Sequence, residues 1–153
     1  NYFYKDKPQQ KAYQEYFENV LENIQLFDCF QVYGHMDYVN RYGEYENREL
    51  NPSHYRDIID EILISLIRKE KGLEVNTSGF KYGLGHPHPK LEILKRYREL
   101  GGEIITIGSD AHSPQWIASH FYDAYALLKE AGFKAFTVFE KQQPTWVDIP
   151  KNI

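Results

Sequence analysis

Three short segments of the 153-residue sequence contain the side chains best suited to bind metal ions or phosphate. The first contains His35, the second contains Asn76, and the third contains Asp110 and His112. A carboxylate and an imidazole two residues apart can reach one metal ion or two adjacent ions. Mixed nitrogen and oxygen ligands suit Zn, Mn or Fe better than Ca or Mg. Three such ligands are too few for a closed site, so either other residues complete a catalytic site or no metal is bound.

Each of these segments follows a short apolar run that is too brief for a helix. The runs are rich in β-branched or aromatic residues and are bounded by helix ends or glycine, which is typical of strands. We expect strands at 30–33, 73–75, 104–107 and 135–139. Apolar residues at three- and four-residue spacing predict helices between them. We expect helices at 8–27, from 51–52 to the glycine at 72, at 89–100 and from 113–114 to the glycine at 132.

The alternation of helices and strands predicts an α/β fold with a parallel sheet and helices outside it. A barrel and an open doubly wound sheet both fit this order. In either fold the carboxyl ends of the strands share one face, where active sites form. His35, Asn76, Asp110 and His112 can therefore converge, although they lie far apart in the sequence.

Each of these residues also has a purely structural interpretation. His35 alone fits a hydrogen-bonded structural residue, and Asp110 fits a helix cap near Ser113. Glu74, at the end of the second strand, can simply point outward. Cys29 is expected to be a small buried hydrophobe and not a nucleophile.

Composition limits the classes of function. The net charge is −4, and Lys and Arg are scattered among acids, which gives no support for nucleic-acid binding. No stretch approaches the ~18 apolar residues of a membrane span. The single cysteine suits a reducing compartment, so we expect a cytoplasmic protein. The sequence opens with Asn1, not Met, and we expect that its true start has been removed.

The three segments, in their order, resemble motifs of the histidinol-phosphatase branch of the PHP (polymerase and histidinol phosphatase) family. Each motif includes one of the candidate residues and its neighbours, and the resemblance covers nearly the whole chain. A run at 91–94 before the glycine pair at 101–102 is also similar to that branch. The motifs are Gly34-His35-Met36-Asp37 followed by Arg41-Tyr42, Glu74-Val75-Asn76-Thr77-Ser78-Gly79, and Gly108-Ser109-Asp110-Ala111-His112.

The resemblance implies a distorted (β/α)7 TIM-like barrel with two or three metal ions at the strand ends. It implies that His35, Asp110 and His112 are metal ligands and catalytic residues. The implied reaction is the hydrolysis of L-histidinol phosphate to L-histidinol and phosphate, late in histidine biosynthesis. The implied partner is therefore a small-molecule phosphoester, with neither nucleic acid nor a membrane involved.

Other polar residues in the same loops are candidates for binding the phosphate. The planar guanidinium of Arg41 suits a phosphate, and Lys81 can act as a point charge, although both also fit solvated surface cations. Asn76 and Ser78, with the threonine between them, can hydrogen-bond the substrate or shape a turn. The histidines at 86 and 88 can line the mouth of the pocket and meet the substrate's imidazole, but the favoured interpretation is that one or both are ordinary exposed loop residues.

The chain departs from the family pattern in one large respect, since the His-x-His pair expected near the N-terminus is absent. We therefore expect residues 1–153 to be the C-terminal part of a single PHP barrel domain, incomplete and inactive alone. Two alternatives remain open. One is a PHP-family phosphoesterase acting on another phosphoester or on nucleic acid. The other is a non-catalytic fragment that self-associates, because a half barrel exposes sheet edges, and a homo-oligomer would cover them.

Overall fold

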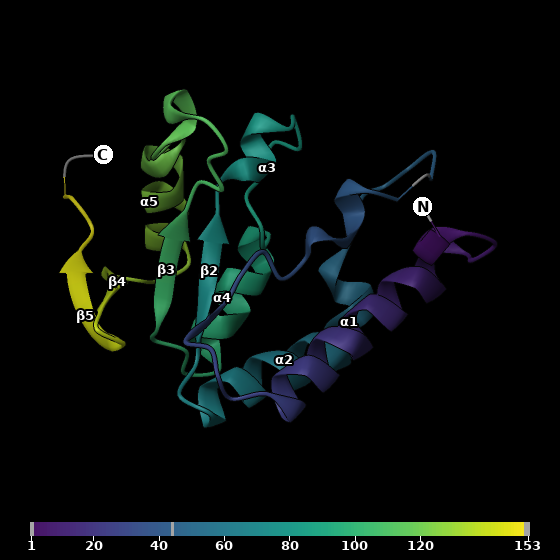
Figure 1. Cartoon of the computed structure of the whole chain (residues 1–153), viewed down its shortest axis with the longest axis horizontal. Coiled ribbons are helices and arrows are strands. Elements are labelled where there is room, and N and C mark those ends of the chain that lie inside the picture. The colour runs from purple at the N-terminus through teal and green to yellow at the C-terminus, as the bar shows by residue number, and fades with distance from the viewer. Residues whose placement is uncertain (1, 44, 152–153) are drawn as a thin grey trace.

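The chain forms an α/β structure around a three-stranded parallel sheet, as expected from the sequence (Figure 1). The computed structural model describes residues 2–43 and 45–151. The strands are β1 (Val32–Tyr33), β2 (Gly72–Asn76) and β3 (Ile105–Gly108), in the order β1-β2-β3. In the register, Leu73 of β2 lies opposite Tyr33 and Ile105. The central strand β2 is buried along most of its length, as apolar strands covered by helices are.

Three of the four predicted helices form close to where the apolar spacing placed them. The long helices α1 (Gln9–Leu26) and α2 (Arg56–Arg68) pack against each other, and the single-turn helix α3 (Ser78–Lys81) follows β2 (Figure 1). Helix α4 (Leu91–Glu99) precedes β3, and α5 (Phe121–Glu130) follows it. Short 3-10 helices are η1 (Tyr2–Tyr4), η2 (Tyr38–Arg41), η3 (Pro52–Tyr55) and η4 (Pro114–Trp116).

The core lies between the helices and the sheet. Fully buried side chains on the inner faces of α1, α2, β2 and α4 build it, and they include Phe17, Ile24, Ile62, Leu63, Leu66, Leu73, Ile93 and Leu94. Outside this core, α4 is joined to α2 by a bidentate ion pair between Arg96 and Asp60, with two nitrogen–oxygen distances of 2.8 Å. Hydrogen bonding to Arg96 holds the pKa of Asp60 below its ordinary value.

The predicted fourth helix begins later than expected. Residues after Ser113 make only the short helix η4, and α5 starts at Phe121. Ala118 and His120 adopt positive φ angles of 56° and 60°, which interrupt an α-helix. His120, which the apolar pattern placed within the helix, therefore lies just before it.

The predicted fourth strand forms but does not extend the parallel sheet. Strand β4 (Ala135–Glu140) pairs antiparallel with β5 (Gln143–Asp148), a strand that the sequence did not indicate. The buried Thr137 side chain accepts a hydrogen bond from the backbone N–H of Ile105, 3.2 Å away, and so links β4 to β3. The first strand is also shorter than expected. Cys29, predicted to be buried, is exposed because the segment before β1 runs over the surface.

Among the described residues, no helix combines the length and the apolar character that a membrane span requires.

Candidate active site at the strand ends

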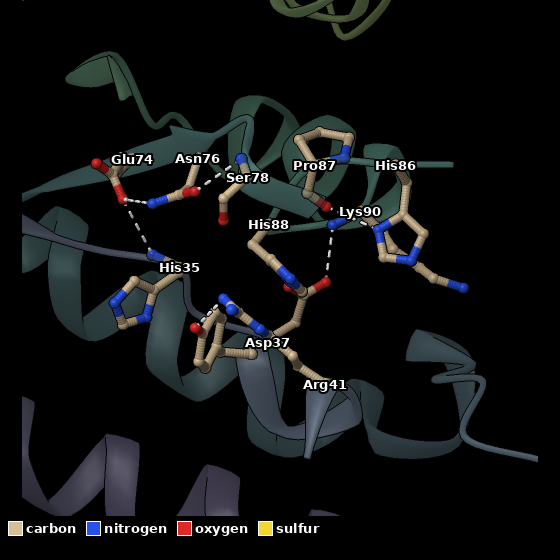
Figure 2. Close-up of polar contacts among 11 residues, drawn as sticks. His35, Asp37, Arg41, Glu74, Asn76, Ser78, His86, Pro87, His88 and Lys90 are labelled. Atoms are coloured by element: carbon tan, nitrogen blue, oxygen red, sulfur yellow. Dashed lines mark hydrogen bonds and ion pairs between the residues drawn. The ribbon is translucent and has the colours of Figure 1, made fainter. Parts of the chain in front are cut away.

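The Glu74 carboxylate lies at the centre of the carboxyl edge of the sheet. One of its oxygens, Oε2, accepts hydrogen bonds from the His35 backbone N–H at 3.3 Å and from the Asn76 side-chain amide at 3.1 Å (Figure 2). Glycines that follow β1 and end β3 leave room for this carboxylate, because a Cβ at Gly34 or Gly108 would crowd it. Glu74, for which the sequence suggested an outward orientation, therefore connects the ends of all three strands.

This packing predicts that a single methyl group at Gly108 displaces the Glu74 carboxylate. The Cβ of Gly108→Ala would lie 2.2 Å from Glu74 Oε1 and 3.1 Å from Glu74 Cδ, so the carboxylate must move. Because the crowded atoms belong to a side chain and not to the backbone, we expect the free energy of unfolding to fall by about 1 kcal/mol, the lower end for overpacked sites, when measured by urea denaturation. Gly34→Ala is the matched control, because its Cβ would lie farther from the carboxylate, 3.1 Å from Glu74 Oε2 and 3.9 Å from Glu74 Cδ. Equal losses in the two variants would contradict this account.

Asp110 and His112 lie directly after β3, and their side chains face each other. The distance between Asp110 Oδ1 and His112 Nε2 is 3.3 Å. Two atoms that bind one tetrahedral ion at about 2.1 Å lie roughly 3.4 Å apart, so this pair matches two neighbouring ligand positions. The Asp110 side chain is partly exposed and that of His112 is mostly exposed, which leaves both open to an ion from solvent.

His35 occupies the other side of Glu74. Both His35 and Asp110 adopt positive φ angles, 36° and 47°, which non-glycine residues rarely take. Such conformations cost free energy and are concentrated at functional sites. The described residues contain no group of three or more His, Cys, Asp or Glu side chains arranged to hold a metal ion. The described residues thus bring two candidate ligands together, Asp110 and His112, and His35 does not join them in one cluster.

A buried pair, Asp37 and His88, joins the first motif to the loop before α4. Asp37 Oδ1 lies 2.6 Å from His88 Nδ1, and Asp37 Oδ2 accepts the backbone N–H of Lys90 at 2.8 Å (Figure 2). Both side chains of the pair are fully buried. His88 also pairs through its backbone with Asn76, at 2.7 and 2.8 Å.

The expectation of ordinary exposed positions is therefore wrong for His88. It is partly wrong for His86, which is half-buried and lies 5.8 Å from the His88 ring. Asn76 faces Gly108 of β3 in the register, so the loop occupies the edge of Asn76 that β1 leaves free. Asp37 was part of a quoted motif, and only the fold reveals its partner. The Nε2 atom of His88 and the Oγ atom of Ser78 are both buried without a hydrogen-bond partner among the described residues.

The guanidinium group of Arg41 lies among three tyrosine rings. It stacks on Tyr82 at 3.4 Å from the ring centroid, and Tyr38 and Tyr42 lie at 4.9 and 5.2 Å. Arg41 Nη1 also donates a hydrogen bond to the Tyr38 hydroxyl. Figure 2 shows the Arg41 side chain. Burial raises the pKa of Tyr38, the hydrogen bond with Tyr42 raises it further, and the negative charge of Asp110 adds a smaller effect in the same direction.

The remaining phosphate-binding candidates lie nearby but differ in what they can offer. Lys81 extends over the rings of Tyr82 and Trp116, at 5.1 and 4.9 Å. The Asn76 side chain is engaged at both ends, because its Oδ1 accepts the Ser78 N–H at 3.0 Å and its Nδ2 donates to Glu74. Asn76 therefore shapes the turn, whereas the Ser78 hydroxyl has no hydrogen-bond partner among the described residues.

The chain is similar to known proteins in sequence and in fold. The family described as "PHP domain" matches residues 1–78, about half of the chain. The histidinol-phosphatase of Lactococcus lactis subsp. lactis is 37% identical over 144 residues, which is 90% of this chain and 51% of that protein. The probable histidinol-phosphatase of Thermotoga maritima is 34% identical over 139 residues, covering 90% of this chain and 56% of that protein.

A solved structure is also similar. The histidinol phosphate phosphatase of Lactococcus lactis subsp. lactis, in complex with zinc, L-histidinol and phosphate, superposes with a TM-score of 0.78 at 31% identity. The superposition covers 94% of this chain and 54% of that one. The chain thus spans about half the length of the relatives it matches. The matched region includes the strand-end motif of His35 and the turn at Asn76. On this match, the chain belongs to the PHP domain family.

Proposed function

We propose that the protein is a metal-dependent phosphomonoesterase that hydrolyses L-histidinol phosphate to L-histidinol and phosphate. The observation that carries this proposal is the gathering of the three motifs at one edge of the parallel sheet, in a fold similar to that of a phosphatase solved with zinc, L-histidinol and phosphate. The activity would belong to histidine biosynthesis, and its setting would be the cytoplasm.

Three residues are proposed to bind the metal. Asp110 and His112 supply two neighbouring ligands, and His35 approaches from the far side of Glu74. Zn, Mn or Fe suits this donor set, with two or three ions in a complete site. A bound divalent ion supplies Lewis acidity and lowers the pKa of water. The chain's own contribution is to fix these side chains through strained backbone and the Glu74 hydrogen bonds.

The phosphoryl group is proposed to bind beside Arg41. The Tyr82 ring lies over the guanidinium, so its edge is suited to meet a planar pair of phosphate oxygens. The buried hydroxyl of Ser78 supplies a further hydrogen bond, and Asn76 holds the turn that presents it. Lys81 contributes positive charge at the rim, where two aromatic rings restrict it.

We further propose that residues 1–153 form part of a (β/α)7 barrel and that homo-oligomers form. The parallel order of β1, β2 and β3 and the superposition on 54% of a solved phosphatase support the barrel. Exposed apolar side chains on the hairpin of β4 and β5, namely Val138, Trp146 and Val147, support association between copies.

The direct test is release of phosphate from L-histidinol phosphate in the presence of Zn or Mn. Because the chain spans about half of its relatives, the assay uses the chain alone and the chain joined to the portion of the Lactococcus lactis enzyme that it does not match. We expect metal-dependent hydrolysis in the longer protein, loss on chelation, and no cleavage of a dinucleotide phosphodiester. If the longer protein binds metal but does not hydrolyse L-histidinol phosphate, or if it cleaves the phosphodiester, the proposal is rejected.

A further inference from the structure

Tyr38 contacts both halves of the proposed site. Its ring lies 4.6 Å from the His35 imidazole, between centroids, with the planes tilted by 34°. Its hydroxyl accepts a hydrogen bond from Arg41 Nη1 and lies 3.2 Å from the Tyr42 hydroxyl. One side chain therefore touches a candidate metal ligand through its ring and a candidate phosphate-binding cation through its oxygen.

The backbone of Tyr38 is anchored on both sides. Its N–H donates to the His35 carbonyl at 3.1 Å, and the preceding residue is the buried Asp37, which His88 and Lys90 hold in place. The ring of Tyr38 also packs edge-on against His88, at 5.2 Å between centroids. A side chain on such a rigid support can fix the orientation of its neighbours.

The hydroxyl of Tyr38 controls how the Arg41 guanidinium is turned. Stacking on Tyr82 fixes the plane of the guanidinium, but the group is still free to rotate within that plane. The hydrogen bond from Nη1 to the Tyr38 hydroxyl stops this rotation, and it occupies one edge of the guanidinium. The other edge of the guanidinium then points in a fixed direction, as bidentate binding of an oxyanion requires.

We propose that Tyr38 is a positioning residue with two separable parts. The ring orients His35 for metal binding, and the hydroxyl orients Arg41 for phosphate binding. This inference rests on the proposed function, because it assigns Tyr38 to the same site. It predicts that removing the hydroxyl weakens phosphate binding alone, whereas removing the ring also weakens zinc binding. A general loosening of the fold would weaken both in each variant.

The test compares Tyr38→Phe with Tyr38→Leu by measuring two affinities of the full chain. Zinc affinity is measured by calorimetry and inorganic phosphate affinity by NMR titration. We expect Tyr38→Phe to weaken phosphate binding roughly 10-fold, the loss of one charge-assisted hydrogen bond, and to leave zinc affinity within about 2-fold. Tyr38→Leu should weaken zinc affinity about 10-fold as well, because groups that orient a ligand have effects of this size.

Tyr97→Phe is the matched control, since Tyr97 is a buried tyrosine of α4 whose hydroxyl bonds the Ile104 carbonyl. It should change neither affinity. Equal losses of both affinities in Tyr38→Phe, or unchanged zinc affinity in Tyr38→Leu, would overturn the proposal, as would a wild-type chain that binds neither ion. Hydrolysis of L-histidinol phosphate is measured separately, in the longer protein. A longer protein that binds both ions without hydrolysis refutes the function and still tests Tyr38.

Discussion

Asp110→Asn, made in the longer protein that includes the unmatched portion of the Lactococcus lactis enzyme, is expected to reduce zinc affinity and phosphate release by at least about 100-fold. The change replaces an anionic ligand with a neutral amide of the same shape, and groups that only orient a ligand already cost about 10–100-fold. The fold should survive, because Asn tolerates the positive φ of 47° that Asp110 adopts. Calorimetric titration with zinc and the phosphate-release assay measure the two losses.

The control for this variant is Asp148→Asn, which makes the same chemical change on the exposed strand β5. It should leave zinc affinity unchanged, since Asp148 lies outside the strand-end motifs. If Asp110→Asn keeps its zinc affinity, Asp110 is not a ligand, and its contact with His112 is an ordinary surface ion pair. Such a pair contributes only about 0–1 kcal/mol.

Asp37→Ala is expected to lower the free energy of unfolding by about 4 kcal/mol, the cost of removing one partner of a buried pair. The substitution leaves His88 Nδ1 and the Lys90 N–H without their acceptor in a region closed to water. The loop that His88 pins against Asn76 should loosen with it. Urea denaturation of the variant measures the loss.

Two comparisons isolate the buried pair. Asp60→Ala removes the carboxylate of the partly exposed ion pair with Arg96, and its loss should be clearly smaller. A double-mutant cycle with His88→Ala should give a coupling of about 1–3 kcal/mol, because Asp37 and His88 are in direct contact. Additive losses in the cycle would show that Asp37 acts through Lys90 alone.

The sequence by itself determined the class of fold and the edge of the sheet at which the three motifs lie. Apolar spacing located the long helices, and short apolar runs located β2 and β3 within a residue or two. Because parallel strands end at one edge, the motifs of His35, Asn76 and Asp110 had to lie there. These inferences succeeded because they depend on local periodicity and on chain direction, both of which are written in the sequence.

The tertiary structure decided what each polar side chain contacts. Glu74 could not be read as the link between strands, because its position depends on glycines from β1 and β3. His88 and Asp37 lie 51 residues apart, and no local pattern signals such a pair. The sequence also missed two tight turns. Ala118 and His120 after His112, and Lys141 and Gln142 between β4 and β5, adopt positive φ angles without the glycines that usually mark such turns. Local propensity selects helices and strands, whereas hydrogen bonds between loops form only after those elements have packed.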